Sequence, residues 1–271
     1  MGERQRDHPL GRGWRWGSRP VNIVSVTPAE VIVILLAVMA GALVKAITGM
    51  GFPLVAIPVI SLFVSVETAV VVIAFPNAAA NALLAFHERS AWPRTRDLPI
   101  LIPTSIVGAV AGTFLLVSLP ERALTIALAV AVLVYIAIRL RSPDLVLSPA
   151  RSRQFAPPVG LAAGVFQGAI GVSGPVVGSW IHSYRLPRDA HVLSVTSMFL
   201  FSGLAQLVIL TGDGQFDRGR AAATLAATIP AIGLIPVGTR MRGRLSGRGF
   251  DNAVLGLLAV SAVALVLRSI V

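Results

Sequence analysis

Long apolar runs separated by short polar stretches cover the chain from about residue 29 to its end. Runs such as 31–44 and 123–138 are almost entirely apolar, whereas the strands of a membrane β-barrel would alternate apolar and polar residues. Arginines stand in the short stretches between the runs. This pattern is typical of a chain whose helices cross a membrane several times. We therefore predict an all-α polytopic membrane protein.

The pattern predicts five helical segments in each half of the chain. In the first half they cover residues 29–48, 53–65, 67–86, 98–118 and 122–140. In the second half they cover residues 159–170, 175–184, 190–210, 220–237 and 250–270. The chain then divides into a polar basic tail at 1–28, a first membrane repeat at 29–141, a basic connecting loop at 142–156 and a second membrane repeat at 157–271.

A glycine–proline break follows the first segment of each half. The breaks are residues 45–53 (KAITGMGFP) and 167–175 (QGAIGVSGP). Gly49 and Gly171 match at a spacing of 122 residues, and Gly112 and Gly238, each followed by threonine, match at a spacing of 126. We therefore predict an internal duplication, a common feature of secondary transporters.

The relative orientation of the two halves depends on the short segments 159–170 and 175–184. At 1.5 Å per residue they would be about 18 and 15 Å long, too short to cross a ~30 Å hydrocarbon core alone. A single broken crossing gives parallel halves, whereas a hairpin or two tilted crossings gives inverted halves. The loop arginines favour inverted halves by the positive-inside rule, although including the tail and Arg268 reverses that preference. We predict inverted repeats, with both termini on one side of the membrane.

Composition supports a membrane protein and weakens the alternatives. The 271 residues are 55% hydrophobic and 13% charged, against about 25% charged in soluble domains. A net charge of +11 would suggest nucleic acid in a soluble protein, but arginine loops between spans explain it here, so no nucleic-acid partner is predicted. The expected partners are a small anion and the lipid bilayer of the inner (plasma) membrane, and homodimerisation is left open.

Proline in each break suits the first turn of a new helix. The breaks would then present half-helix N-termini, whose N–H groups need a partner that lipid cannot supply. An anion or water in a cavity would be that partner, and close helix packing by small residues is the alternative reading. The predicted binding residues in the breaks are Thr48, Gly49, Gly51, Gly171, Ser173 and Gly174.

Four longer polar side chains complete the predicted site. Lys45 is the only lysine in the chain, and a lysine at the bilayer centre costs about 3 kcal/mol, so it should face a cavity or a partner unless it snorkels to the interface. Gln167 occupies the matching position in the second half. Asn77 and Asn81 share one helix face, where they could bind substrate or join helices. We predict an asymmetric pocket, charged on one side and neutral on the other.

No enzyme motif is visible. The chain contains no HExxH, GxSxG or Walker sequence, and its few acids stand in loops or near segment ends. The absence of cysteine excludes disulfides and thiol nucleophiles. We therefore predict neither an enzyme, nor a cofactor or metal, nor a self-contained ATP-driven pump.

The two halves, each opening with an apolar run into a glycine–proline motif, resemble the sulfite exporter TauE/SafE family over about residues 30–270. The motifs are Gly41 with 48–53 (TGMGFP) and Gly164 with 168–175 (GAIGVSGP). The resemblance implies a permease for small anions, often sulfur-containing ones such as sulfite, sulfonates or thiosulfate. We expect transport of such an anion by alternating access. A permease for another organic anion or a neutral solute, and a membrane assembly factor, remain as alternatives.

Overall fold

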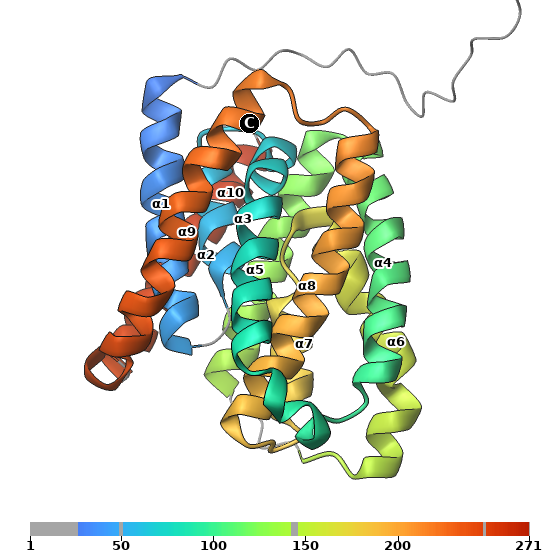
Figure 1. Ribbon diagram of the computed structural model, residues 1–271. Helices are drawn as coiled ribbons and strands as arrows, with labels where there is room; N and C mark the ends of the chain where they lie inside the picture. Colours follow the sequence, from blue (N-terminus) through green and yellow to red (C-terminus); the bar gives the residue numbers. More distant parts are fainter. Residues whose placement is uncertain (1–26, 49–50, 142–145, 246–247, 271) are drawn as a thin grey trace, which may run out of the picture.

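The computed structural model describes residues 27–48, 51–141, 146–245 and 248–270. Within these residues the chain forms ten α-helices and one 3-10 helix, with no strand (Figure 1). The all-α prediction is therefore confirmed. The predicted polar tail lies outside the described residues as far as residue 26, and so does Gly49.

The helices follow the predicted order. The first half contains α1 (Pro28–Thr48), α2 (Phe52–Ile60), α3 (Val66–His87), the 3-10 helix η1 (Arg89–Arg94), α4 (Leu98–Ser118) and α5 (Glu121–Arg141). The second half contains α6 (Pro149–Ile170), α7 (Gly174–His182), α8 (Arg188–Gly212), α9 (Arg218–Leu245) and α10 (Arg248–Ile270).

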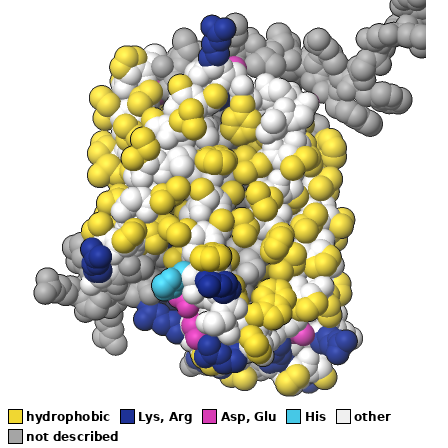
Figure 2. Space-filling view, viewed as in Figure 1, with side chains coloured by type: hydrophobic (Ala, Val, Ile, Leu, Met, Phe, Trp, Pro, Cys, Tyr) yellow, Lys and Arg dark blue, Asp and Glu magenta, His cyan; other side chains and the backbone are white. Residues whose placement is uncertain are grey.

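Seven of these helices, α1, α3, α4, α5, α8, α9 and α10, contain spans long and apolar enough to cross a membrane. Apolar side chains cover much of the visible surface, and Lys and Arg side chains gather mainly at its lower end (Figure 2). Helices α2 and α7 have nine residues each and are about 13 Å long, so neither crosses the membrane alone. The chain is a multi-pass membrane protein.

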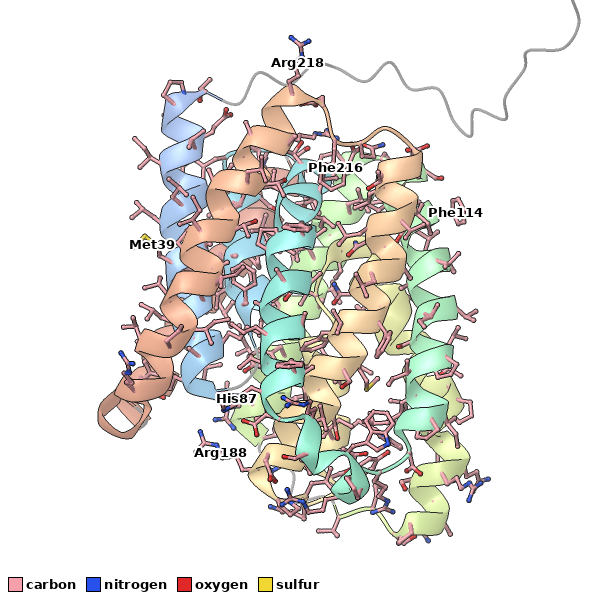
Figure 3. All side chains as sticks on the ribbon, in the orientation of Figure 1. Met39, His87, Phe114, Arg188, Phe216 and Arg218 are labelled. Atoms are coloured by element: carbon pink, nitrogen blue, oxygen red, sulfur yellow. The ribbon has the colours of Figure 1, made fainter. Side chains whose placement is uncertain are left out.

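The labelled residues in Figure 3 fix the direction of four helices. His87 ends α3 and Arg188 begins α8, and both lie at the lower end of the molecule. Phe216, between α8 and α9, and Arg218, the first residue of α9, are at the upper end, as is Phe114 near the end of α4. Helices α3 and α9 therefore run downwards in this view, and α4 and α8 run upwards.

Both glycine–proline breaks turn the chain back on itself. A Cβ placed on Gly41 would lie 2.7 Å from the carbonyl oxygen of Phe52, so α2 returns alongside α1. In the second half the N–H of Leu147, before α6, donates to the carbonyl oxygen of Ser183, after α7, at 3.2 Å. Each break is thus a hairpin and not a single interrupted crossing.

Small residues allow α4 and α6 to pack closely. A Cβ on Gly164 would lie 2.1 Å from the carbonyl oxygen of Ser105, and one on Gly168 would lie 2.3 Å from that of Ala109. Such close approach of two backbones is a common way for membrane helices to associate. Helix α9 packs against α1, helix α3 packs against α8, and α5 packs against α10.

Helix α6 differs from the prediction. It begins at Pro149, inside the predicted connecting loop 142–156, and has 22 residues, or about 33 Å. The expectation of a segment too short to cross was therefore wrong for α6, although it held for α7. Ser148 caps the helix by accepting the Arg151 N–H at 3.5 Å, and the paired prolines 157 and 158 lie inside the helix instead of ending it. Membrane helices tolerate such prolines because neighbouring groups satisfy the freed carbonyls.

Candidate functional site

Lys45 lies at the centre of the first polar cluster. Its Nζ donates to Oδ1 of Asn81 at 2.5 Å, and Nδ2 of Asn81 donates to Oδ1 of Asn77 at 3.1 Å. Nζ also lies 6.0 Å from the ring centre of Phe199 on α8. Three helices, α1, α3 and α8, therefore surround the ammonium group. We call Lys45, Asn77, Asn81 and Phe199 the lysine cluster.

The lysine side chain is enclosed and does not snorkel. Lys45 is 1% exposed, and its partner Asn81 is 0% exposed. Asn81 stands six residues before the end of α3, about 9 Å from the lower end of that helix. No ion pair joins Lys45 to a carboxylate within the described residues. Among the described residues, an amide dipole and an aromatic ring are what face the ammonium charge.

Gln167 and Gln206 form a second polar cluster between α6 and α8. Nε2 of Gln206 donates to the carbonyl oxygens of Gln167 and Gly168 at 3.1 and 3.0 Å. Nε2 of Gln167 donates to Oε1 of Gln206 at 3.5 Å, and Oγ of Ser173 donates to Oε1 of Gln167 at 3.0 Å. All of these side chains are buried. We call Gln167, Ser173 and Gln206 the glutamine cluster.

The two clusters lie at different depths along α8. Phe199 and Gln206 are seven residues apart on this helix, which puts them on similar faces about 10 Å apart. The glutamine cluster is nearer the upper end of α8, and the lysine cluster is nearer the lower end of α3. No hydrogen bond or ion pair between the described side chains joins them. The residues expected in one pocket thus occupy two neighbouring positions.

The glycines of the breaks adopt backbone conformations that other residues rarely take. Gly51, the N-cap of α2, has φ +104°, and Gly171, the C-cap of α6, has φ +69°. A Cβ on Gly171 would lie 2.4 Å from Cδ1 of Ile57, so the second break touches α2. The second break therefore lies beside the helix that follows the first break. The side chain of Thr48 and all of Gly49 fall outside the described part of the chain.

The N-terminus of α7 opens onto unfilled space. Gly174, its first residue, is buried, yet a Cβ placed on it would meet no heavy atom within 4 Å. Ser173 at the N-cap makes no side-chain cap bond to α7, and its hydroxyl donates to Oε1 of Gln167. Pro175 has no N–H, and the N–H groups of Val176 and Val177 donate to the carbonyl oxygen of Ser173 at 3.1 and 3.0 Å, which leaves the N–H of Gly174 as the donor at this helix start. With the positive end of the helix dipole and the adjacent space, this donor suits a small anion.

Two residues of these clusters were not among the predicted binding residues. Gln206 is the first of them, and the signal for it is that a buried amide at Gln167 requires a partner on a neighbouring helix. Phe199 was not singled out. It stands 122 residues after Asn77, the spacing of the two breaks, so comparing the halves position by position would have indicated it.

Among the described residues, no group of three or more His, Asp or Glu side chains could hold a metal ion. None of the curated proteins compared and none of the solved structures compared matches the chain. A family model described as sulfite exporter TauE/SafE matches residues 33–265, which is nearly the whole chain. The chain therefore belongs to the sulfite exporter TauE/SafE family, whose members are membrane transporters and not enzymes.

Proposed function

We propose that this protein carries a small sulfite-like anion, such as sulfite or an organosulfonate, across the inner membrane by alternating access. The observation that carries the proposal is Lys45, a buried lysine without a carboxylate partner among the described residues. Such a charge is costly in a membrane unless a counter-ion visits it. A transported anion would be that counter-ion.

The half-helix N-termini supply the rest of the binding chemistry. Helix α2 begins at Phe52 beside the C-terminal part of α1, which carries Lys45, and α7 begins at Gly174 beside the glutamine cluster. An oxyanion with three oxygens can accept N–H donors from a helix end and hydrogen bonds from amides or hydroxyls at once. The lysine cluster then offers a charged position and the glutamine cluster a neutral one, about 10 Å further along α8.

We include inverted repeats in the proposal, because two halves of opposite orientation would let the two positions open in turn to opposite sides of the membrane. The pairing of α4 with α6 corresponds to that of α9 with α1, and the pairing of α3 with α9 corresponds to that of α8 with α4. Corresponding helices also run in opposite directions, as α3 and α8 do (Figure 3). Gly112 approaches the backbone of Val165 and Ala169, and its counterpart Gly238 approaches Leu43 and Ala46. Such halves commonly rock about a central site.

The lower end of the molecule is the cytoplasmic side in this proposal. Arg89, Arg94 and Arg96 precede α4 at this end, Arg185 precedes α8, and Arg188 is the first residue of α8. Cytoplasmic loops of membrane proteins carry an excess of such residues. Both the start of α1 and the end of α10 would then lie on the outer side.

Anion flux into proteoliposomes tests the proposal. Sulfite and methanesulfonate uptake would be measured for the wild type, Lys45→Met and Lys45→Arg. Loss of a charge-assisted contact should reduce flux about tenfold or more in Lys45→Met, with partial activity in Lys45→Arg. Ser202→Ala, which removes a buried α8 hydroxyl that donates to the carbonyl oxygen of Met198 in the same helix, is the matched control.

Three outcomes would count against the proposal. Unchanged anion flux in Lys45→Met would remove the role of the lysine. Flux of a neutral solute instead of either anion would favour the neutral permease. Absence of flux of every solute would favour a membrane assembly factor, provided that the purified protein remains folded.

A further inference from the structure

Two ion pairs join helices at opposite ends of the bundle. At the upper end, Nη2 of Arg220 on α9 lies 3.0 Å from Oε1 of Glu67 on α3. At the lower end, Nη2 of Arg94, which ends η1 just before α4, lies 2.5 Å from Oδ2 of Asp189 on α8. We call Glu67 and Arg220 the upper pair, and Arg94 and Asp189 the lower pair.

The two pairs are counterparts in the two halves of the chain. Glu67 and Asp189 are each the second residue of their helix and are 122 residues apart, the spacing of the glycine–proline breaks. Arg94 and Arg220 are 126 residues apart, the spacing of Gly112 and Gly238. Helix α9 packs against α3 as α4 packs against α8. One spacing therefore relates the two acids, and a second spacing relates the two arginines.

We propose that the upper and lower pairs are the two gates of the transport cycle, and this inference rests on the alternating access proposed above. Each pair ties a helix of the binding clusters, α3 or α8, to a helix of the other half. Breaking the upper pair frees the upper ends of α3 and α9, and breaking the lower pair frees the lower ends of α8 and α4. Both pairs are formed in this structure, which therefore corresponds to a state closed at both ends.

The gates differ in strength. The side chains of Arg220 and Glu67 are 6% and 23% exposed. Arg220 also donates from Nη1 to Oε1 of Gln215 at 2.6 Å, and its Nε lies 3.7 Å from Oδ2 of Asp217. The side chains of the lower pair are 50% and 33% exposed. Water and salt screen an exposed pair far more than a buried one. The lower gate should therefore open more readily, and sodium chloride should favour the cytoplasm-facing state.

Thiol labelling tests the gates without any substrate. The chain has no cysteine, so Ser197→Cys on α8, at a buried position, provides a single reporter in the interior. Its reaction with a membrane-impermeant maleimide would be followed from each face in right-side-out and inside-out vesicles. We expect Asp189→Asn to speed labelling from the lower face by about fivefold, because an exposed pair is weak. We expect Glu67→Gln to speed labelling from the upper face by on the order of tenfold or more, because its partner is buried.

Matched variants separate gating from general loosening. Arg89→Gln lies in the same 3-10 helix as Arg94, and Arg218→Gln lies two residues before Arg220, so both remove a nearby arginine outside the pairs. Each of these variants, made in the Ser197→Cys protein, should be labelled at the same rate as Ser197→Cys alone. The exchange Arg94→Asp with Asp189→Arg should restore the slow rate from the lower face. Faster labelling from both faces in a single gate variant, no change in either variant, or no restoration by the exchange would overturn the gates.

The labelling experiment tests the gates, the flux experiment tests the proposed function, and either can fail without the other. If neither sulfite nor methanesulfonate is transported but each gate variant opens only its own face, the gates stand and the substrate class is wrong. If the anions are transported through Lys45 but the gate variants do not change labelling, the gates are wrong and the proposed function stands.

Discussion

The ammonium group of Lys45 and the amide oxygen of Asn81 are 2.5 Å apart across the interface of α1 and α3, and both residues are almost completely buried. An amide oxygen orients a lysine without neutralising it. A carboxylate at position 81 would have satisfied the same lysine more strongly. The neutral partner therefore leaves the positive charge of Lys45 without a neutralising carboxylate among the described residues.

Replacing Asn81 with aspartate should abolish anion transport while preserving the fold. The new carboxylate would pair with Lys45 permanently and exclude the substrate by competition. Sulfite flux in proteoliposomes should fall to the level of empty vesicles, and the thermal midpoint in detergent should not fall. Retained flux in Asn81→Asp would contradict a direct contact between Lys45 and the anion.

Replacing Asn81 with leucine should instead destabilise the protein. Lys45 would lose its acceptor while remaining enclosed, at a cost of about 2 kcal/mol in the free energy of unfolding. The double variant Lys45→Met with Asn81→Leu removes both partners and should recover most of that loss. Thermal unfolding of the four proteins in one detergent completes the double-mutant cycle. Additive effects would contradict the coupling of the two side chains.

Gly171 and Gly174 should respond differently to alanine. Gly171 has φ +69°, and a Cβ would approach Ile57, so Gly171→Ala should cost about 1–2 kcal/mol and lower the thermal midpoint. Gly174 has no such restriction and faces open space, so Gly174→Ala should leave stability unchanged. If an anion binds at the start of α7, the same methyl group should still reduce sulfite flux severalfold. Wild-type flux in Gly174→Ala would place the anion elsewhere.

Much of the fold could be predicted from the sequence, because apolar runs in a membrane protein report helices directly. The start of α6 could not, because Pro157 and Pro158 indicate a helix stop in water but are accommodated inside a packed membrane helix. The cap at Ser148 and the proline after it were the signals for the true start.

The candidate site was only partly predictable. Burial and spacing indicate Lys45, Asn81 and Gln167 because polar groups in apolar runs need partners. Which partners they find depends on how the hairpins fold back, and no local pattern encodes that. Gln206 therefore hydrogen-bonds to Gln167 within the second half, whereas the aromatic neighbour of Lys45, Phe199, comes from α8 of the other half.

Gln206 should stabilise the end of α6. Methionine at this position keeps the size of the side chain but cannot donate to the carbonyl oxygens of Gln167 and Gly168. The carbonyl oxygen of Gln167 still accepts the N–H of Gly171 at 2.9 Å in this variant. The free energy of unfolding should therefore fall by about 1 kcal/mol, as for other hydrogen bonds between membrane helices. Thermal unfolding of Gln206→Met beside Ser202→Ala measures it, and equal midpoints in Gln206→Met and the wild type would contradict a stabilising role.

Accessibility of two single cysteines should reveal the orientation of the halves. Ser90 in η1 follows α3, and Thr211 near the end of α8 occupies the corresponding region of the second half; both are exposed. Inverted halves put these positions on opposite faces, whereas parallel halves would put them on the same face. We expect an impermeant maleimide to reach Ser90→Cys only from the cytoplasm, where the arginine-rich loops belong, and Thr211→Cys only from outside. Labelling of both cysteines from one side would contradict the inverted arrangement and, with it, the correspondence of the two gates.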